Sequence, residues 1–241
     1  MSKGPRLFTD IGKKAKDLLT RDFNSDQKFT VSTYSDAGVA LTSTVYKYKN
    51  AVFDVKTIAS FKVPDYNSGK LEVQYFHDHA TLTTAVALNQ SPAIDVSATI
   101  GTPSIAFGAE AGYDTTTGNF MKYTAGLSVA KPESSASIIL GDKGDNIKAS
   151  YVHHLDQFKK SAAIGEITRK FSTNKNTFTV GGSYAIDSLT VVKAKLNNHG
   201  KLGALLQHEV IPKSVLTVFG EVDTKALDKN PKFGLAIALW P

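Results

Sequence analysis

Two hydrophobic periods divide the chain. In the first part, apolar residues recur every three to four positions and form one stripe, Leu7, Ile11, Ala15 and Leu18. This spacing predicts an amphipathic helix over residues 7–21. From about residue 27 the period is two, and turn-forming sequences such as Gly141-Asp142-Lys143-Gly144 interrupt it at short intervals. The sequence therefore predicts a helix followed by a long run of strands joined by short turns.

The alternation is clearest between residues 121 and 129. Apolar side chains occupy the odd positions from Met121 to Val129, and the even positions carry Lys122, Thr124, Gly126 and Ser128. Successive side chains of a strand point to opposite faces, so this segment predicts one apolar and one polar face. The segments that repeat this split include 177–184, 201–207 and 232–239.

About 16 such segments of about 8–12 residues follow one another, which is the length of a tilted strand that crosses a bilayer. A closed barrel of that size encloses water and turns its apolar face outward, and Thr, Ser, Gly and Lys suit the wet face. The predicted fold class is all-β, a transmembrane antiparallel β-barrel. A large soluble all-β protein shows the same local alternation and stays open as an alternative.

Composition narrows the classes of protein. The chain has 241 residues and no cysteine, which excludes disulfides and thiolate metal sites. Its mean hydropathy is -0.15, and no stretch approaches the roughly 18 consecutive apolar residues of a transmembrane helix. The formal net charge of +6 comes from lysines spread along the chain, a distribution that favours small anions and gives no footprint for nucleic-acid recognition.

Several stretches carry a resemblance to a known family. Residues 184–198, which begin Tyr184-Ala185-Ile186-Asp187-Ser188 and end Lys195-Leu196-Asn197-Asn198, continue to Gly203-Ala204-Leu205-Leu206. This run resembles the signature of eukaryotic mitochondrial porins, the voltage-dependent anion channels. Residues 8–21 look like the family's N-terminal helix. The stretches 62–70, 72–78 and 220–223 resemble its plant branch.

The resemblance implies a barrel of the mitochondrial outer membrane with the helix in its lumen as a gating element. It implies a voltage-gated, weakly anion-selective channel that passes small hydrophilic metabolites such as ATP, ADP and phosphate. The implied surroundings are membrane lipid and anionic metabolites and nucleotides in transit, without cofactor or enzymatic activity, and a homo-oligomer stays open. One domain over residues 1–241 is expected, with helix and linker in 1–24 and the barrel in 25–241.

The chain departs from the family in length. It lacks about three dozen residues, near Thr44-Val45 and Lys56-Thr57, which would remove about three of about 19 strands. An even count of about 16 predicts that the strand near 27–34 meets the strand near 232–239 antiparallel. The shortening also keeps a second function open, a non-conducting barrel or docking scaffold derived from such a channel.

Lysines supply the candidate chemistry of a pore, because rings of Lys and Arg select anions. Every second residue of a strand lies on one face, and we call this odd or even position its parity. The lysines on the less apolar parity of their strands are Lys28, Lys62, Lys70, Lys122, Lys148, Lys193, Lys195, Lys201 and Lys232. The family's lumen helix would add Lys13, Lys16 and Arg21. Lysines also occupy the solvated face of any sheet, so this pattern becomes specific only within a barrel.

Two further motifs could be functional but also have an ordinary structural interpretation. The C-terminal residues Lys232, Gly234, Ile237 and Leu239 are similar to the signal by which mitochondrial barrels are recognised for assembly, although an ordinary final strand has the same pattern. His77-Asp78-His79 places two histidines on one side of a strand with no third convergent ligand, so no metal site is predicted.

Overall fold

The computed structural model describes residues 4–23, 29–33, 38–45, 53–62, 69–89, 92–156, 160–212, 214–226 and 231–239. The chain begins with a 3-10 turn, η1 (Phe8–Asp10), and helix α1 (Lys13–Leu19). The strands that follow are β1 (Phe29–Thr33), β2 (Gly38–Val45), β3 (Phe53–Lys62), β4 (Lys70–His77), β5 (Ala80–Ala87), β6 (Ala93–Gly101), β7 (Ile105–Asp114), β8 (Asn119–Ala130), β9 (Ser134–Gly141), β10 (Asn146–His154), β11 (Ala162–Lys170), β12 (Lys175–Ala185), β13 (Thr190–Asn197), β14 (Lys201–Ile211), β15 (Ser214–Asp223) and β16 (Lys232–Leu239). A second 3-10 turn, η2 (Asp142–Gly144), joins β9 to β10.

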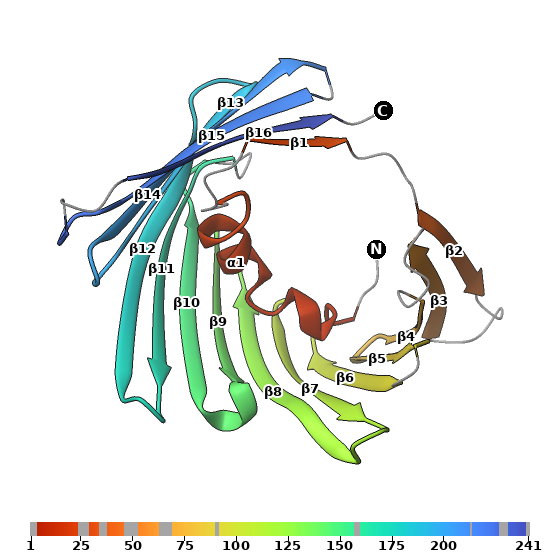
Figure 1. The fold of residues 1–241 in the computed structure, drawn as a ribbon. Helices are drawn as coiled ribbons and strands as arrows, with labels where there is room; N and C mark the ends of the chain where they lie inside the picture. The colour runs from red at the N-terminus through yellow and green to blue at the C-terminus, as the bar shows by residue number, and fades with distance from the viewer. Residues whose placement is uncertain are drawn as a thin grey trace.

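Within the described residues, sixteen strands form one sheet, in the order β1-β16-β15 and then down the chain to β3-β2. Short connections join strands that are consecutive along the chain, so each pairs antiparallel with the next from β2 to β16. The sheet curls into a wall around helix α1 (Figure 1). The all-β antiparallel class predicted from the alternation is confirmed.

The pairing of the first and last strands differs from the prediction. β1 lies parallel to β16, from Phe29 opposite Leu235 to Thr33 opposite Leu239, so the expected antiparallel ladder was wrong. The two edges of the sheet are β1 and β2, and no ladder joins them among the described residues.

The directions of the strands explain why β1 and β2 do not pair with each other. Direction reverses at each antiparallel pairing, and an even number of these separates β2 from β16, so β2 and β16 run the same way. β1 is parallel to β16 and therefore also runs in the direction of β2. A direct ladder between β1 and β2 would have to be parallel, but the connection of residues 34–37 is shorter than the dozen or so residues that a parallel crossover needs. Closure of the wall stays a prediction.

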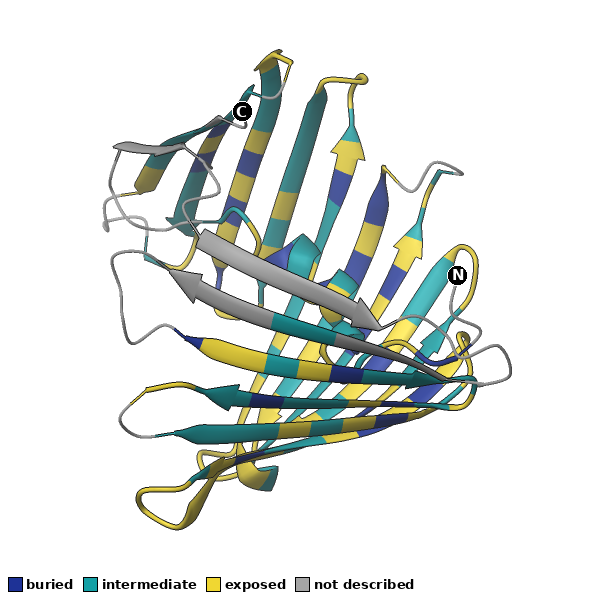
Figure 2. Ribbon diagram, turned by 90° about the vertical axis from the view of Figure 1, so that its right-hand side faces the viewer, coloured by how far each residue is buried: buried dark blue, intermediate teal, exposed yellow. Residues whose placement is uncertain are grey.

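The two faces of the sheet alternate as the sequence pattern indicates, and along many of the strands whose burial is described, exposed bands alternate with less exposed ones (Figure 2). On β8, Met121, Tyr123 and Leu127 are exposed, whereas Gly126 beside them is buried. A Cβ atom at Gly126 would come within 3.0 Å of the Ile11 side chain. Gly126 therefore marks the inner face, which holds the N-terminal segment, and the apolar side chains mark the outer face.

Apolar residues continue from strand to strand across the outer face. Leu127 lies between Phe107 of β7 and Ile138 of β9, and Ile167 of β11 lies opposite Phe178 of β12. Each of these side chains is exposed. Neighbouring apolar residues on adjacent strands stabilise the sheet, but so broad an exposed apolar surface is typical of an interaction with protein or membrane.

Candidate functional site: the inner face and its helix

The N-terminal segment is one predicted helix broken in two. Gly12 takes the left-handed conformation with φ 72° and separates η1 from α1. This conformation suits glycine because it has no Cβ. A single helix over residues 7–21 was therefore wrong in its continuity, although the turn and the helix lie within the predicted range.

One apolar side of this segment packs on the inner face, but it is shifted from the predicted stripe, since Leu7 and Leu18 are only partly buried. Phe8, Ile11, Ala15 and Leu19 are at most 7% exposed. Ala15 and Leu19 join Val152, Ala162 and Ile164 of the wall in one buried cluster. The helical period thus determines which side of the segment touches the wall, because residues three and four apart lie on one face.

Glycines on the wall make room for these side chains. A Cβ atom at Gly108 would lie 2.8 Å from Phe8 Cδ2, and one at Gly181 would lie 2.9 Å from Leu19 Cδ2. Both distances are too short for a real contact, and a carbonyl oxygen of the neighbouring strand, Ala98 or Ala194, lies equally near. An alanine at either place would therefore force the helix side chain, the strand or both to shift. The sequence pattern did not identify these glycines, since a glycine on the polar face of a strand also suits a plain lumen wall.

The polar side of the segment carries its basic residues. Lys13, Lys16 and Arg21 are exposed on the side away from the wall, where the resemblance places charge beside permeating anions. Lys13 makes an ion pair of 3.4 Å with Asp10, one turn earlier. Exposed pairs of this kind contribute little to stability.

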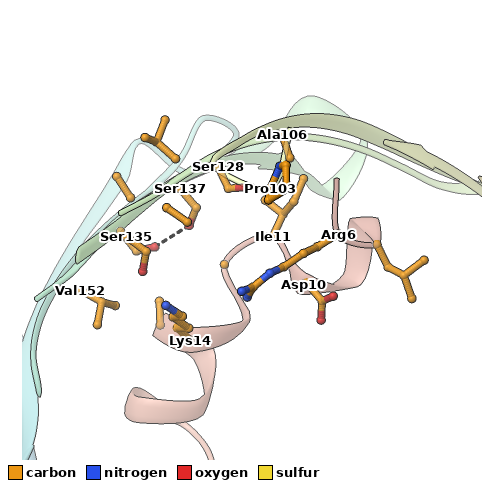
Figure 3. A pocket seen from close by; sticks show the side chains of 17 residues that line it. Arg6, Asp10, Ile11, Lys14, Pro103, Ala106, Ser128, Ser135, Ser137 and Val152 are labelled. Carbon is orange, nitrogen blue, oxygen red and sulfur yellow. Dashed lines mark hydrogen bonds between the residues drawn. The ribbon is translucent and has the colours of Figure 1, made fainter. Parts of the chain in front are cut away.

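A pocket opens between the N-terminal segment and strands β7 to β10. Arg6 and Lys14 point into it from the segment, together with Asp10 (Figure 3). Hydroxyl groups line the opposite wall, where Ser137 and Ser150 are 2.8 Å apart and hydrogen bonded. The arrangement combines cations with hydroxyl donors, which suits transient contact with anions.

Three of the predicted wall lysines, Lys70, Lys122 and Lys148, form ion pairs with carboxylates of the wall, and Lys70 Nζ lies 2.9 Å from Glu72 on its own strand. Lys122 Nζ lies 3.3 Å from Asp95 and 3.6 Å from Glu110 on neighbouring strands, and Lys148 Nζ lies 3.5 Å from Glu166. The sequence pattern alone does not pair these carboxylates with the lysines, although each carboxylate lies on the same face of the sheet as its lysine. Their presence reduces the positive field that the lysines alone would create.

The other predicted lysines divide into three groups. Lys195 contacts Leu19, the last residue of the helix, and Lys193 contacts Asp22 in the turn that follows it. Lys201 and Lys232 are exposed near the ends of their strands. Lys62 ends β3, where the structure describes only its backbone, and Lys28 lies outside the described residues.

The C-terminal strand contains the predicted assembly residues. Lys232 and Gly234 share one face of β16, and Ile237 lies on the other. The ring of Phe219 covers Gly234, so a Cβ atom there would overlap the ring. Gly234 thus has a packing reason to lack a side chain. Leu239 ends the strand, and recognition of these residues during assembly stays a prediction.

Two other features are absent from the described part of the chain. It contains no group of three or more His, Cys, Asp or Glu side chains placed to hold a metal ion. It also contains no helix with the length and hydropathy to cross a membrane.

A turn between β12 and β13 shows how the strand ends are ordered. The Asp187 carboxylate accepts hydrogen bonds of 2.7 Å from the backbone N–H groups of Leu189 and Thr190. It also accepts one of 2.9 Å from the Thr190 hydroxyl. The Leu189 N–H, followed by the Thr190 hydroxyl, lowers the pKa of Asp187 from its ordinary value.

Comparison with a protein-family model gives two overlapping matches to the eukaryotic porin family, over residues 4–53 and 44–234. The overlap lies at the first of the two places where the sequence suggests a deletion. Together the two matches span most of the chain.

Plant proteins are similar over their full length. The chain is 64% identical to "Mitochondrial outer membrane protein porin 2" of Arabidopsis thaliana, covering 100% of both chains. It is 54% identical to "Mitochondrial outer membrane protein porin 5" of Oryza sativa subsp. japonica, covering 99% of each. The first alignment runs over 276 positions, 35 more than the 241 residues of this chain. The expected shortening of about three dozen residues is confirmed.

Solved structures of bacterial porins share the fold. Variants of Rhodopseudomonas blastica porin match with a TM-score of 0.59 at 10% identity, over 81% of this chain and 86% of that one. At this identity the likeness concerns the fold alone.

Proposed function

The chain belongs to the eukaryotic porin family, and from that premise we propose that it forms a voltage-gated, weakly anion-selective channel for small hydrophilic metabolites. Its location is the mitochondrial outer membrane, the one named for its plant relatives. Phosphate, ADP and ATP are the proposed solutes. The family is one of channels and not of enzymes. The observation that carries the proposal is the division of the sheet into an apolar outer face and a polar inner face that holds a basic helix.

The outer face supports insertion in lipid. A residue such as Phe107 or Phe178, about half exposed, leaves apolar area in contact with its surroundings at a cost of about 25 cal/mol per Å² in water. Contact with lipid tails removes this cost, because they are as apolar as the side chains. A soluble β-protein would instead need a second layer over the same face.

The inner face supports passage of hydrated anions. Lys16 on the helix and Arg21 just beyond its end are exposed cations. Several wall lysines are paired with carboxylates, which favours weak over strong anion selectivity. A basic helix inside a polar wall therefore attracts anions without binding them tightly.

The open edge between β1 and β2 favours a second candidate, a barrel that does not conduct and serves as a docking scaffold. A pore requires a closed wall, and unpaired backbone groups that face lipid cost several kcal/mol each. The channel proposal requires that the wall closes in the membrane, with the backbone groups of these edges satisfied by something other than a direct ladder between β1 and β2.

Planar-bilayer recording of the purified protein separates the two candidates. A channel gives conductance steps and, in a KCl gradient, a reversal potential on the anion side. Lys16→Glu should move that potential toward the cation side, since the local charge changes by two units. Lys143→Glu is the matched control, because Lys143 lies on the η2 turn between strands. Silence from protein with intact β-structure would support the scaffold, and equal shifts in both variants would remove Lys16 from the conducting path.

A further inference from the structure

Lys195 lies between two glycines on the inner face. Its cross-strand neighbours are Gly181 on β12 and Gly203 on β14. A Cβ atom at Gly181 would approach Leu19 Cδ2 to 2.9 Å, and one at Gly203 would approach Phe23 Cδ1 to 3.5 Å. At Gly181 the missing side chain therefore leaves space for Leu19. At Gly203 a distance of 3.5 Å is an ordinary van der Waals contact, and the missing side chain leaves space for Lys195 itself, whose Cε would lie 3.2 Å from such a Cβ atom.

The N-terminal segment contacts the Lys195 ammonium at two points. Lys195 Nζ donates a hydrogen bond of 2.8 Å to the carbonyl oxygen of Leu19 and lies 4.0 Å from the centroid of the Phe23 ring. Leu19 is the last residue of α1, where carbonyl groups lack helical partners and carry partial negative charge. The wall thus supplies a cation that satisfies the end of the helix and also binds the face of an aromatic ring.

A second lysine of the same strand contacts the turn after the helix. Lys193 Nζ donates to Asp22 Oδ2 at 3.3 Å, and its side chain is only 12% exposed. Asp22 has φ 71°, a left-handed conformation that is uncommon for residues with a side chain. The ion pair therefore holds the backbone at the point where the chain turns away from the helix.

We infer that Lys193 and Lys195 are positioning residues, which hold the C-terminal end of the lumen helix against β13, and that they contribute little to anion selectivity. Their charges are engaged by Asp22, the Leu19 carbonyl and the Phe23 ring. Lysines of the same parity that make no contact with the helix, such as Lys201, keep their charge available to solutes. Register and parity alone do not separate these two groups, whereas the contacts do.

The absence of cysteine from the chain allows a direct test. A nitroxide spin label at Lys16→Cys, an exposed helix position, reports helix mobility in full-length protein reconstituted in lipid vesicles. Lys195→Gln should raise the mobile fraction on the order of tenfold, because it removes a charge-assisted hydrogen bond. Lys195→Arg keeps the charge, the donor and the ring contact, and should restore the immobile spectrum.

Lys201→Gln is the matched control, since it removes the same charge from the neighbouring strand. It should leave the spectrum unchanged and shift the reversal potential more than Lys195→Gln does. An unchanged spectrum in Lys195→Gln protein with native β-structure, or no rescue by arginine, would overturn the positioning role. The spectrum does not depend on conduction, so a silent channel with a released helix would contradict the proposed function and still support this inference.

Discussion

Shortening Leu19 to alanine should release the helix from the wall. Leu19 is 4% exposed and fills the space that Gly181 leaves on β12. No side chain at Gly181 can move into the vacated volume. The substitution therefore creates a cavity between helix and wall and does not let the two surfaces close.

The magnitude follows from the three carbon atoms removed. At about 0.8 kcal/mol per buried carbon the loss is about 2.4 kcal/mol, and buried Leu→Ala changes cost about 2–5 kcal/mol when a cavity remains. Since 1.4 kcal/mol is a tenfold change in an equilibrium constant, the undocked population should rise about 50-fold. The effect falls on helix docking, because Leu19 belongs to the helix and makes no strand pairing.

Cysteine labelling can measure this population. Ala162, 3% exposed, belongs to the same buried cluster as Leu19. A cysteine at Ala162 should react slowly with a water-soluble maleimide while the helix is docked. When docking is fast relative to labelling, the rate is proportional to the undocked fraction, and Leu19→Ala should raise it about 50-fold.

Leu202→Ala is the matched control. It removes the same three carbons from the outer face, where Leu202 is 41% exposed. Labelling at Ala162 should not respond to it. Equal acceleration by both substitutions would mean that the whole wall had loosened, and no acceleration by Leu19→Ala would refute docking through this contact.

Three further predictions concern gating, register and pH. Deletion of residues 1–21 should flatten the voltage dependence of the conductance and leave the β-content measured by circular dichroism intact. Moving one charge through 100 mV contributes only about 2.3 kcal/mol, so the channel needs a charged element such as this segment to sense the voltage. The parallel register predicts that cysteines at Phe29 and Leu235 cross-link, and that Phe29 with Leu239 does not; the reverse result would restore the antiparallel arrangement. The Asp187 pKa is lowered from 3.8, so its turn should keep its hydrogen bonds above that pH and lose them as pH falls through the lower folded value. The Thr190 amide shift should therefore titrate with a midpoint below 3.8, and a midpoint at or above 3.8 would contradict the hydrogen bonding described.

The sequence by itself determined which segments are strands and which side chains share a face. The alternation from Met121 to Val129 predicts which residues of β8 lie on the outer and which on the inner face, because the two-residue period is a property of the backbone and needs no partner. The stripe of Ile11, Ala15 and Leu18 indicated an amphipathic helix for the same kind of reason. Gly12 carried a signal for the break, since glycine tolerates the left-handed conformation.

Only the tertiary structure decided which elements lie beside one another. The parallel pairing of β1 with β16, the ion pairs of Lys122 and Lys148, and the contacts of Lys195 with the helix all join residues far apart in the chain or on different strands. The parity of a residue tells on which face of the sheet its side chain lies, but not which residue it contacts or at what distance. Those depend on register and on the space left by residues such as Gly181, which are collective properties of the packed sheet.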